Sequence, residues 1–190
     1  MRMTGIYKLE KLAVQGEHGK NWYEQCDAAL RTMCRAEGWP VVHTAAVLGI
    51  TSPRVQVARN AFYTKQYMRE WMLSPKITTH TKLSGLLPMV RRGLEKYEQH
   101  GIISGPKTSA FAGACMGDLS QVVLDTWMAK VLGIHQDTFK RKQIRAKADK
   151  RIRQVADRLG WEPAQTQAAI WTAVYEQHHV SRAPGLHTYF

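Results

Sequence analysis

The sequence predicts an all-α fold, and three observations support this prediction. In several segments apolar residues recur at steps of three and four, which is the spacing of an amphipathic helix. No segment of useful length alternates apolar and polar residues as a half-buried strand does. Hydrophobic residues make up 44% of the 190-residue chain, which is enough to bury a sizeable core. We therefore expect one all-α domain over residues 21–190, which could comprise two helical lobes.

The N-terminal part of the chain contains one clear helical pattern. Residues 1–20 have weak periodicity and three glycines, which indicates a loosely packed N-terminal lead-in. Residues 21–37 have the apolar spacing of an amphipathic helix, which Gly38 and Pro40 should end.

Two further segments follow before the middle of the chain. Residues 41–48 are short and apolar, and Gly49 should end this segment. Ser52 is the predicted N-cap of the next helix and Pro53 its first residue, because these residue types favour those two positions. This helix should run to about Trp71.

A helix, a turn and a second helix are predicted between residues 82 and 116. Leucine and valine recur at helical spacing over 82–99, where Pro88 could kink the helix. Residues 101–105 contain two glycines and should break the helix, and small residues over 106–116 predict the second helix.

The C-terminal part of the chain should contain three helices. A short helix is expected to follow Asp125 and to end at Gly133, and a long charged helix to span 137–159. Glu162 and Pro163 predict the start of a final helix that reaches about residue 177.

The charge of the chain favours a polyanionic partner. Lys and Arg number 27 against 15 Asp and Glu, which gives a formal net charge of +12. Charge alone does not separate DNA from RNA or from an anionic membrane, but together with its placement it favours a nucleic acid. No segment approaches the roughly 18 apolar residues of a membrane span, and no signal peptide is recognisable. We expect a cytoplasmic protein, in a bacterial or phage-infected cell, with no membrane partner.

The cysteines and histidines give no metal-binding pattern. The three cysteines, Cys26, Cys34 and Cys115, are an odd number at wide spacing, so we expect reduced, buried thiols. Eight histidines are present, but none occurs in an HExxH or Cys/His arrangement. We predict neither a metal nor a cofactor.

Two residues that could carry chemistry lie eighteen positions apart. Lys107 lies at the start of the second predicted helix, where the backbone N–H groups of Gly105, Thr108 and Ser109 could hold a phosphate. Asp125 follows an apolar run and lies at the head of another helix. Alone, Asp125 is an ordinary N-cap and Lys107 a surface lysine; their joint spacing favours catalysis.

At these residues the chain resembles the helix-hairpin-helix DNA glycosylase superfamily, of the endonuclease III type. The segment KTSA that begins at Lys107 is similar to the exit of the family hairpin, and LDTWM, which contains Asp125, is similar to the family's aspartate segment. The resemblance covers about residues 82–135. The chain looks more like the small phage-encoded members of the superfamily than like its housekeeping repair enzymes. Two positions depart from the family: Ile103 replaces the first hairpin glycine, and Trp127 replaces a histidine. No cysteine follows Cys115, so the four-cysteine iron–sulfur loop is missing.

The chemistry of N-glycosidic bond cleavage suits these residues. A carboxylate such as Asp125 can stabilise positive charge on the sugar and orient the attacking water. An amine such as that of Lys107 can attack C1′ and form a Schiff base, which gives lyase activity. The target base would leave the stack and enter a pocket, for which Trp127, Phe111 and Trp171 are candidates.

The predicted helix near the C-terminus carries a concentration of positive charge. Residues 139–158 contain nine Lys or Arg and two Asp, so this stretch is a candidate for contacts with DNA phosphates. Lys140, Arg141, Lys142 and Arg145 are the candidates at its start.

Two other functions remain open from the sequence. Residues 129–141 have the spacing of a short helix, a glycine turn and a polar recognition helix, and residues 44–59 have a weaker version around Gly49. A helix-turn-helix protein would be non-enzymatic and dimeric, whereas a glycosylase can act as a monomer, which is the state we expect. A third possibility is a transferase on the same scaffold that adds a group to a modified pyrimidine.

Overall fold

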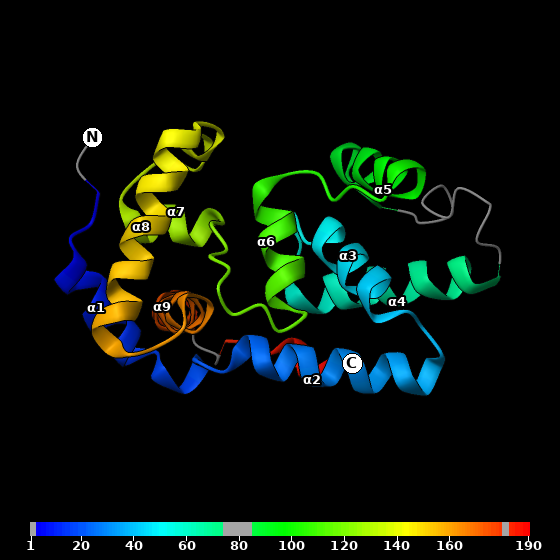
Figure 1. The fold of residues 1–190 in the computed structure, drawn as a ribbon, viewed down its shortest axis with the longest axis horizontal. Helices are drawn as coiled ribbons and strands as arrows, with labels where there is room; N and C mark the ends of the chain where they lie inside the picture. The colour runs from blue at the N-terminus through cyan, green and yellow to red at the C-terminus, as the bar shows by residue number, and fades with distance from the viewer. Residues whose placement is uncertain (1–2, 74–84, 180–182) are drawn as a thin grey trace. The chain divides into compact units, whose positions relative to one another are not determined.

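The structure is a computed structural model that describes residues 3–73, 85–179 and 183–190. Helices and connecting loops account for all of these residues, and no strand occurs among them, so the all-α prediction is confirmed (Figure 1). The α-helices are α1 (Ile6–Gln15), α2 (Trp22–Glu37), α3 (Val41–Thr51), α4 (Val57–Leu73), α5 (Pro88–His100), α6 (Pro106–Ala114), α7 (Thr126–Leu132), α8 (Lys142–Leu159) and α9 (Pro163–His178). Short 3-10 helices are η1 (Glu17–Gly19), η3 (Gln136–Lys140) and η4 (Leu186–Thr188).

The chain divides into two compact units. Unit 1 comprises Met1–Tyr23 and Asp118–Ala183, and unit 2 comprises Glu24–Gly117 and Pro184–Phe190. The boundary at residues 23 and 24 falls inside α2, so one continuous helix begins in unit 1 and ends in unit 2. The predicted lobes therefore correspond to units that each contain their own core.

Unit 1 is built around α9, which packs against α1, α7 and α8. Its core includes Leu9 of α1, Met128 of α7, Ile152 of α8 and Ile170 of α9, all fully buried. A Cβ atom added at Gly16 would lie 2.0 Å from the Ala169 carbonyl oxygen, so the end of α1 and the backbone of α9 are in close contact. The expectation of a loosely packed lead-in over residues 1–20 is therefore wrong, because Met3, Leu9 and Ala13 belong to this core.

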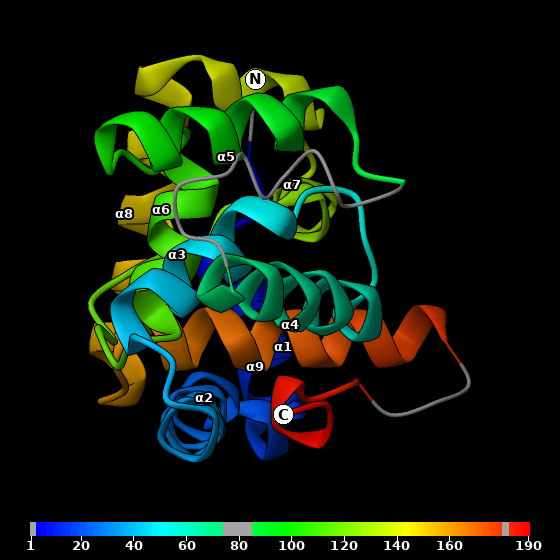
Figure 2. The same ribbon diagram turned by 90° about the vertical axis from the view of Figure 1, so that its right-hand side faces the viewer.

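Unit 2 is built around α3, which packs against α4, α5 and α6 (Figure 2). Every residue from Thr44 to Thr51 is buried, so α3 is the central helix of this unit. Gly49 does not end the helix as predicted. A Cβ atom at this position would lie 2.7 Å from the Thr108 carbonyl oxygen and 2.9 Å from the Ala112 Cβ, so a glycine is required where α3 and α6 cross.

Two predicted helix starts differ from the structure. Ser52 is the C-cap of α3, where its hydroxyl donates to the Gly49 carbonyl oxygen at 2.8 Å, and α4 begins only at Val57. Pro88 is the first residue of α5 and does not kink it. Proline suits the first position of a helix, because the N–H groups of the first turn have no acceptor within the helix. Residues 82–84 of the predicted helix lie outside the described residues.

The predicted elements of the C-terminal part are largely confirmed. Asp125 caps α7, and Gly133 ends it with a φ of 68°. The α9 helix starts at Pro163 after a capping box that Glu162 completes. The long charged helix predicted over 137–159 is divided: η3 forms its first turn, Arg141 is extended, and α8 follows.

Candidate nucleic-acid interface

The candidate site residues fall into two groups, one in each unit. Unit 2 contains Gly105, Lys107, Thr108, Ser109 and Phe111. Unit 1 contains the other candidates, Asp125, Trp127, Lys140, Arg141, Lys142, Arg145 and Trp171. The residues that the sequence analysis assigns to one site therefore belong to two different units.

Asp125 is the N-cap of α7. Its backbone is extended, its side chain is half-buried, and its Oδ1 accepts a hydrogen bond from the Met128 N–H at 2.9 Å. A carboxylate at this position is stabilised because unpaired N–H groups give the start of a helix partial positive charge. The capping role predicted for an isolated Asp125 is therefore present in the structure.

Lys107 is held against α3 by a hydroxyl group and an aromatic ring. Its Nζ donates to the Ser52 Oγ at 2.5 Å and lies 4.9 Å from the centre of the Phe111 ring. The Phe111 side chain is buried, since only 9% of it is exposed. The amine is thus positioned by the packing of α6 on the end of α3.

The start of α6 has few free polar groups. Gly105 has a φ of 95° and a ψ of 135°, a backbone conformation that favours glycine. The Thr108 hydroxyl donates to the carbonyl oxygens of Ser104 and Gly105, and the Ser109 N–H donates to the Gly105 carbonyl oxygen at 3.0 Å. Of the backbone N–H groups predicted to bind a phosphate, that of Ser109 therefore already has an acceptor, as does the neighbouring Thr108 hydroxyl.

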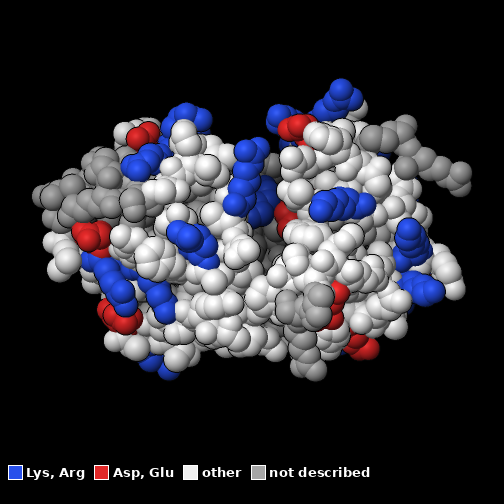
Figure 3. All heavy atoms as spheres, turned by 180° about the vertical axis from the view of Figure 1, so that it is seen from behind, with Lys and Arg blue, Asp and Glu red and all other residues white. Residues whose placement is uncertain are grey.

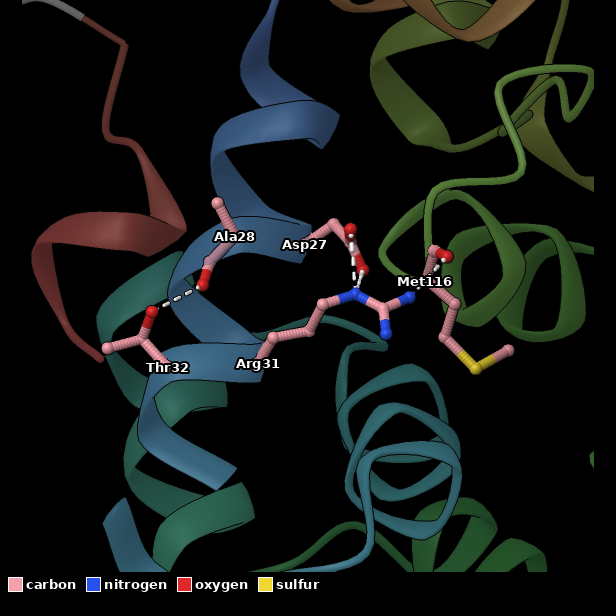
Figure 4. Close-up of polar contacts among 5 residues, drawn as sticks. All are labelled: Asp27, Ala28, Arg31, Thr32 and Met116. Carbon is pink, nitrogen blue, oxygen red and sulfur yellow. Dashed lines mark hydrogen bonds and ion pairs between the residues drawn. The ribbon is translucent and has the colours of Figure 1, made fainter. Parts of the chain in front are cut away.

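The loop after α6 is joined to α2 by a hydrogen bond from an arginine that is itself paired with an aspartate of α2 (Figure 4). The Arg31 Nε donates to the Asp27 Oδ1 at 2.8 Å, and the Arg31 Nη2 donates to the Met116 carbonyl oxygen at 3.3 Å. The hydrogen bond and the negative charge of Asp27 raise the pKa of Arg31. The contact with Met116 holds the loop after α6, and the sequence analysis did not identify it because Arg31 and Met116 are far apart in the chain.

The arginines of α8 have structural partners. Each donates to a carbonyl or carboxylate oxygen of unit 1, so these side chains tie α8 to its surroundings. Arg145 donates to Phe139 at 2.5 Å and Lys140 at 3.1 Å, Arg151 to Thr4 at 2.9 Å, Arg153 to Asp149 at 2.7 Å and Ser120 at 2.9 Å, and Arg158 to Glu10 at 2.6 Å.

The lysines of α8 are arranged differently from its arginines. Lys142, Lys147 and Lys150 are exposed, and no ion pair to them occurs within the described parts of the chain. Helical periodicity places Lys150 on the side of α8 opposite its buried residues Ala148 and Ile152, with Lys142 and Lys147 to either side of it. We refer to these three residues as the lysine face. Arg141 is also exposed, whereas Lys140 pairs with Asp137 at 2.9 Å.

Figure 3 shows one face of the protein, with Lys and Arg side chains spread over the surface among fewer Asp and Glu. The net positive charge of the chain is therefore visible on this face, where the basic side chains are scattered and do not form one continuous patch.

Comparison with known proteins gives one match. A family model described as a family of unknown function, DUF7178, matches residues 5–178. The chain belongs to this family. No curated protein and no solved structure matches it. The DUF7178 match runs from α1 to α9 without a break and therefore covers residues of both units of the structure.

In this DUF7178 protein, two of the three aromatic residues predicted to line a base pocket contact the same third ring, that of Tyr175. The Tyr175 ring lies 5.9 Å from that of Trp127 and 5.2 Å from that of Trp171, measured between ring centres. The sequence analysis did not identify Tyr175, although its position four residues after Trp171 places both on one face of α9. Phe111, the third predicted residue, belongs to unit 2.

The helix-turn-helix elements expected from the sequence differ from the structure. Gly49 lies inside α3, so residues 44–59 contain no turn at that position. The expected recognition helix over 135–141 is the short 3-10 helix η3 followed by the extended Arg141.

Two kinds of feature are absent from the described residues. They contain no group of three or more His, Cys, Asp or Glu side chains that could hold a metal ion. No helix among them has the length and apolar character that a membrane span requires.

Proposed function

We propose that this DUF7178 protein binds DNA through the lysine face of α8. The observation that carries the proposal is the difference between the two kinds of basic residue on this helix. Its arginines are paired with oxygens of unit 1, whereas Lys142, Lys147 and Lys150 are exposed and point away from the core. Exposed ammonium groups without acidic partners are suited to contact phosphates.

The length of the lysine face suits a nucleic-acid backbone. Lys142 and Lys150 are separated by eight residues, over which a helix rises about 12 Å. One strand of duplex DNA carries a phosphate about every 3.4 Å along its axis, so three or four phosphates occur over this length. The net charge of +12 adds a long-range attraction for the same partner.

The dependence of DNA affinity on salt concentration tests this proposal. We expect Lys142→Gln/Lys147→Gln/Lys150→Gln to weaken binding to duplex DNA of any sequence and to reduce the slope of log K against log salt by about 2 to 3, because each lost phosphate contact contributes about 0.9. The matched control is Lys8→Gln/Lys11→Gln/Lys96→Gln, which removes the same charge from exposed lysines elsewhere. Equal losses in the two triple variants would show that only net charge matters and would overturn the proposal.

A second candidate function is DNA glycosylase activity at Asp125. It is supported by the position of this half-buried carboxylate at the head of α7, in the same unit as the lysine face, and by the resemblance of its segment to the helix-hairpin-helix glycosylases. In this reaction water replaces the base at C1′, which releases the free base and leaves an abasic site. A transferase that modifies a pyrimidine on the same scaffold would also use this position.

The substitution Asp125→Asn separates catalysis from capping. Asparagine caps helices about as well as aspartate, so the fold should be retained while the carboxylate charge is lost. Wild type and variant are incubated with oligonucleotides that contain uracil, 8-oxoguanine, alkylated adenine or a modified pyrimidine, and hot alkali reveals abasic sites. Strand breaks that require Asp125 would support the candidate. Breaks made equally by the Asn variant would exclude a catalytic role for this residue.

A further inference from the structure

The strongest unexplained feature of unit 1 is a strip of aromatic and imidazole rings along α7 and α9. It consists of Trp127, Trp171, Tyr175, His178 and His179, which we call the aromatic strip. The rings of Tyr175 and His179 are stacked, with centres 4.2 Å apart and planes at 30°. Trp127 lies across from them, 5.6 Å from His178 and 5.8 Å from His179.

The aromatic strip differs from the buried rings of the protein in its exposure. Trp22 and Tyr23 belong to the core, with 9% and 4% of their surface exposed. By contrast, Trp127, Trp171 and Tyr175 are half-buried, and His178 and His179 are exposed. The Trp171 ring contacts that of Tyr175, which stacks on that of His179, so these rings form a continuous row that reaches the surface at His179. Such a partly exposed row is a candidate binding surface.

A positive charge lies beside this row. The Lys130 ammonium group is 4.3 Å from the centre of the Trp127 ring, and Lys130 is exposed. Asp125, two residues before Trp127, begins the same helix. A ligand at the aromatic strip would therefore meet aromatic rings, the Lys130 ammonium group over the Trp127 ring and a carboxylate at the head of α7.

We propose that the aromatic strip stacks an unpaired nucleobase, with Lys130 near the adjoining phosphate. This inference rests on the proposed DNA-binding function and adds a preference for unpaired nucleotides. Flat rings and a neighbouring cation recognise a base through its π-face, and a base inside a duplex does not offer that face. The lysine face would contact both paired and unpaired DNA, whereas the aromatic strip contacts only unpaired bases.

Affinity for one labelled strand, free and in a duplex, tests this proposal. The variant Trp127→Leu/Tyr175→Leu should weaken binding to the single strand by about fivefold or more, the effect of losing stacking to a base, and change duplex binding by less than about twofold. The matched control, Trp127→Phe/Tyr175→Phe, keeps both rings and should restore most of the single-strand affinity.

A second variant changes only exposed residues, so its effect on binding is separate from any effect on folding. His178→Ala/His179→Ala removes two exposed rings and should also weaken single-strand binding selectively. Circular dichroism and thermal melting of each variant establish that it is folded. If a folded Leu variant binds the single strand as tightly as wild type, or loses equal affinity for both DNA forms, the proposal is overturned.

The lysine-face variant separates this proposal from the proposed function. If Lys142→Gln/Lys147→Gln/Lys150→Gln weakens both DNA forms while the Leu variant changes neither, DNA binding stands and the aromatic strip fails. If only the Leu variant loses affinity, and only for the single strand, the proposal for the aromatic strip is supported and the proposal for the lysine face is overturned. Absence of any DNA binding by the wild type would overturn both.

Discussion

The Asp125 Oδ1 accepts a hydrogen bond from the Met128 N–H at 2.9 Å, and this bond caps the seven-residue helix α7. The cap has a measurable effect on stability. We expect Asp125→Ala to lower the free energy of unfolding by about 1 kcal/mol, because a helix N–H loses its acceptor. Asp125→Asn should change it by only a few tenths, since Asn is an equally good cap. Chemical denaturation measures both, and equal losses for Ala and Asn would contradict the capping interpretation.

The elements that sequence reasoning predicted correctly are those with local signals. Periodic apolar residues predict α2, Glu162 and Pro163 mark the start of α9, and Asp125 and Gly133 mark the ends of α7. These signals act within a few residues, so the sequence alone is sufficient to recognise them. The capping position of Asp125 was recognised for the same reason.

The errors arose where a tertiary contact overrode a local preference. Gly49 has the character of a helix end, but α6 packs so closely on α3 that only glycine fits inside the helix there. The error at residues 6–15 was of a different kind, because Ile6, Leu9 and Ala13 do recur at helical spacing and this local signal was missed; Leu9 and Ala13 are completely buried against the rest of unit 1. The exposure of the α8 lysines and the row of rings around Tyr175 depend on distant partners, so they could be recognised only in the structure.

His43 should make the stability of the protein depend on pH. Its ring is stacked on that of Trp71, with centres 4.1 Å apart, and its buried Nε2 has no hydrogen-bond partner in the described parts of the chain. Burial lowers the pKa of His43 from 6.5 to about 4, because the fold favours the neutral ring. This contribution to stability is complete above pH 6.5 and is lost as pH falls through 4.

The substitution His43→Phe isolates that effect. Phenylalanine keeps a ring against Trp71 but does not titrate, so the stability of wild type relative to the variant should fall by about 1 to 3 kcal/mol between neutral pH and pH 4. The ring is partly exposed, which keeps the expected change below the full value of the pKa shift. Denaturant unfolding at several pH values measures the difference, and parallel curves for the two proteins would contradict the prediction.

The close crossing of α3 and α6 makes Gly49 sensitive to substitution. The Cβ of Gly49→Ala would lie 2.7 Å from the backbone oxygen of Thr108, so the two helices must move apart at a cost of about 1 to 3 kcal/mol. Gly93→Ala is the comparison, because its Cβ would meet only the Ile50 Cγ2 at 3.0 Å, the end of a side chain that can adjust. Thermal melting should show a larger loss for Gly49→Ala, and equal melting temperatures would refute the assignment.

The role of the Lys107 amine can be determined by chemical trapping. If Lys107 is a nucleophile, its amine adds to the C1′ aldehyde of an abasic site and releases water, and borohydride reduces the resulting imine to a stable protein–DNA adduct. Lys107→Met should abolish the adduct. Ser52→Ala, which removes the hydroxyl that accepts from the amine at 2.5 Å, should leave the adduct but change its rate of formation. An adduct that persists in Lys107→Met would assign the reaction to another amine. Lys107 would then have only a structural role, in which its amine contacts the end of α3 and the Phe111 ring.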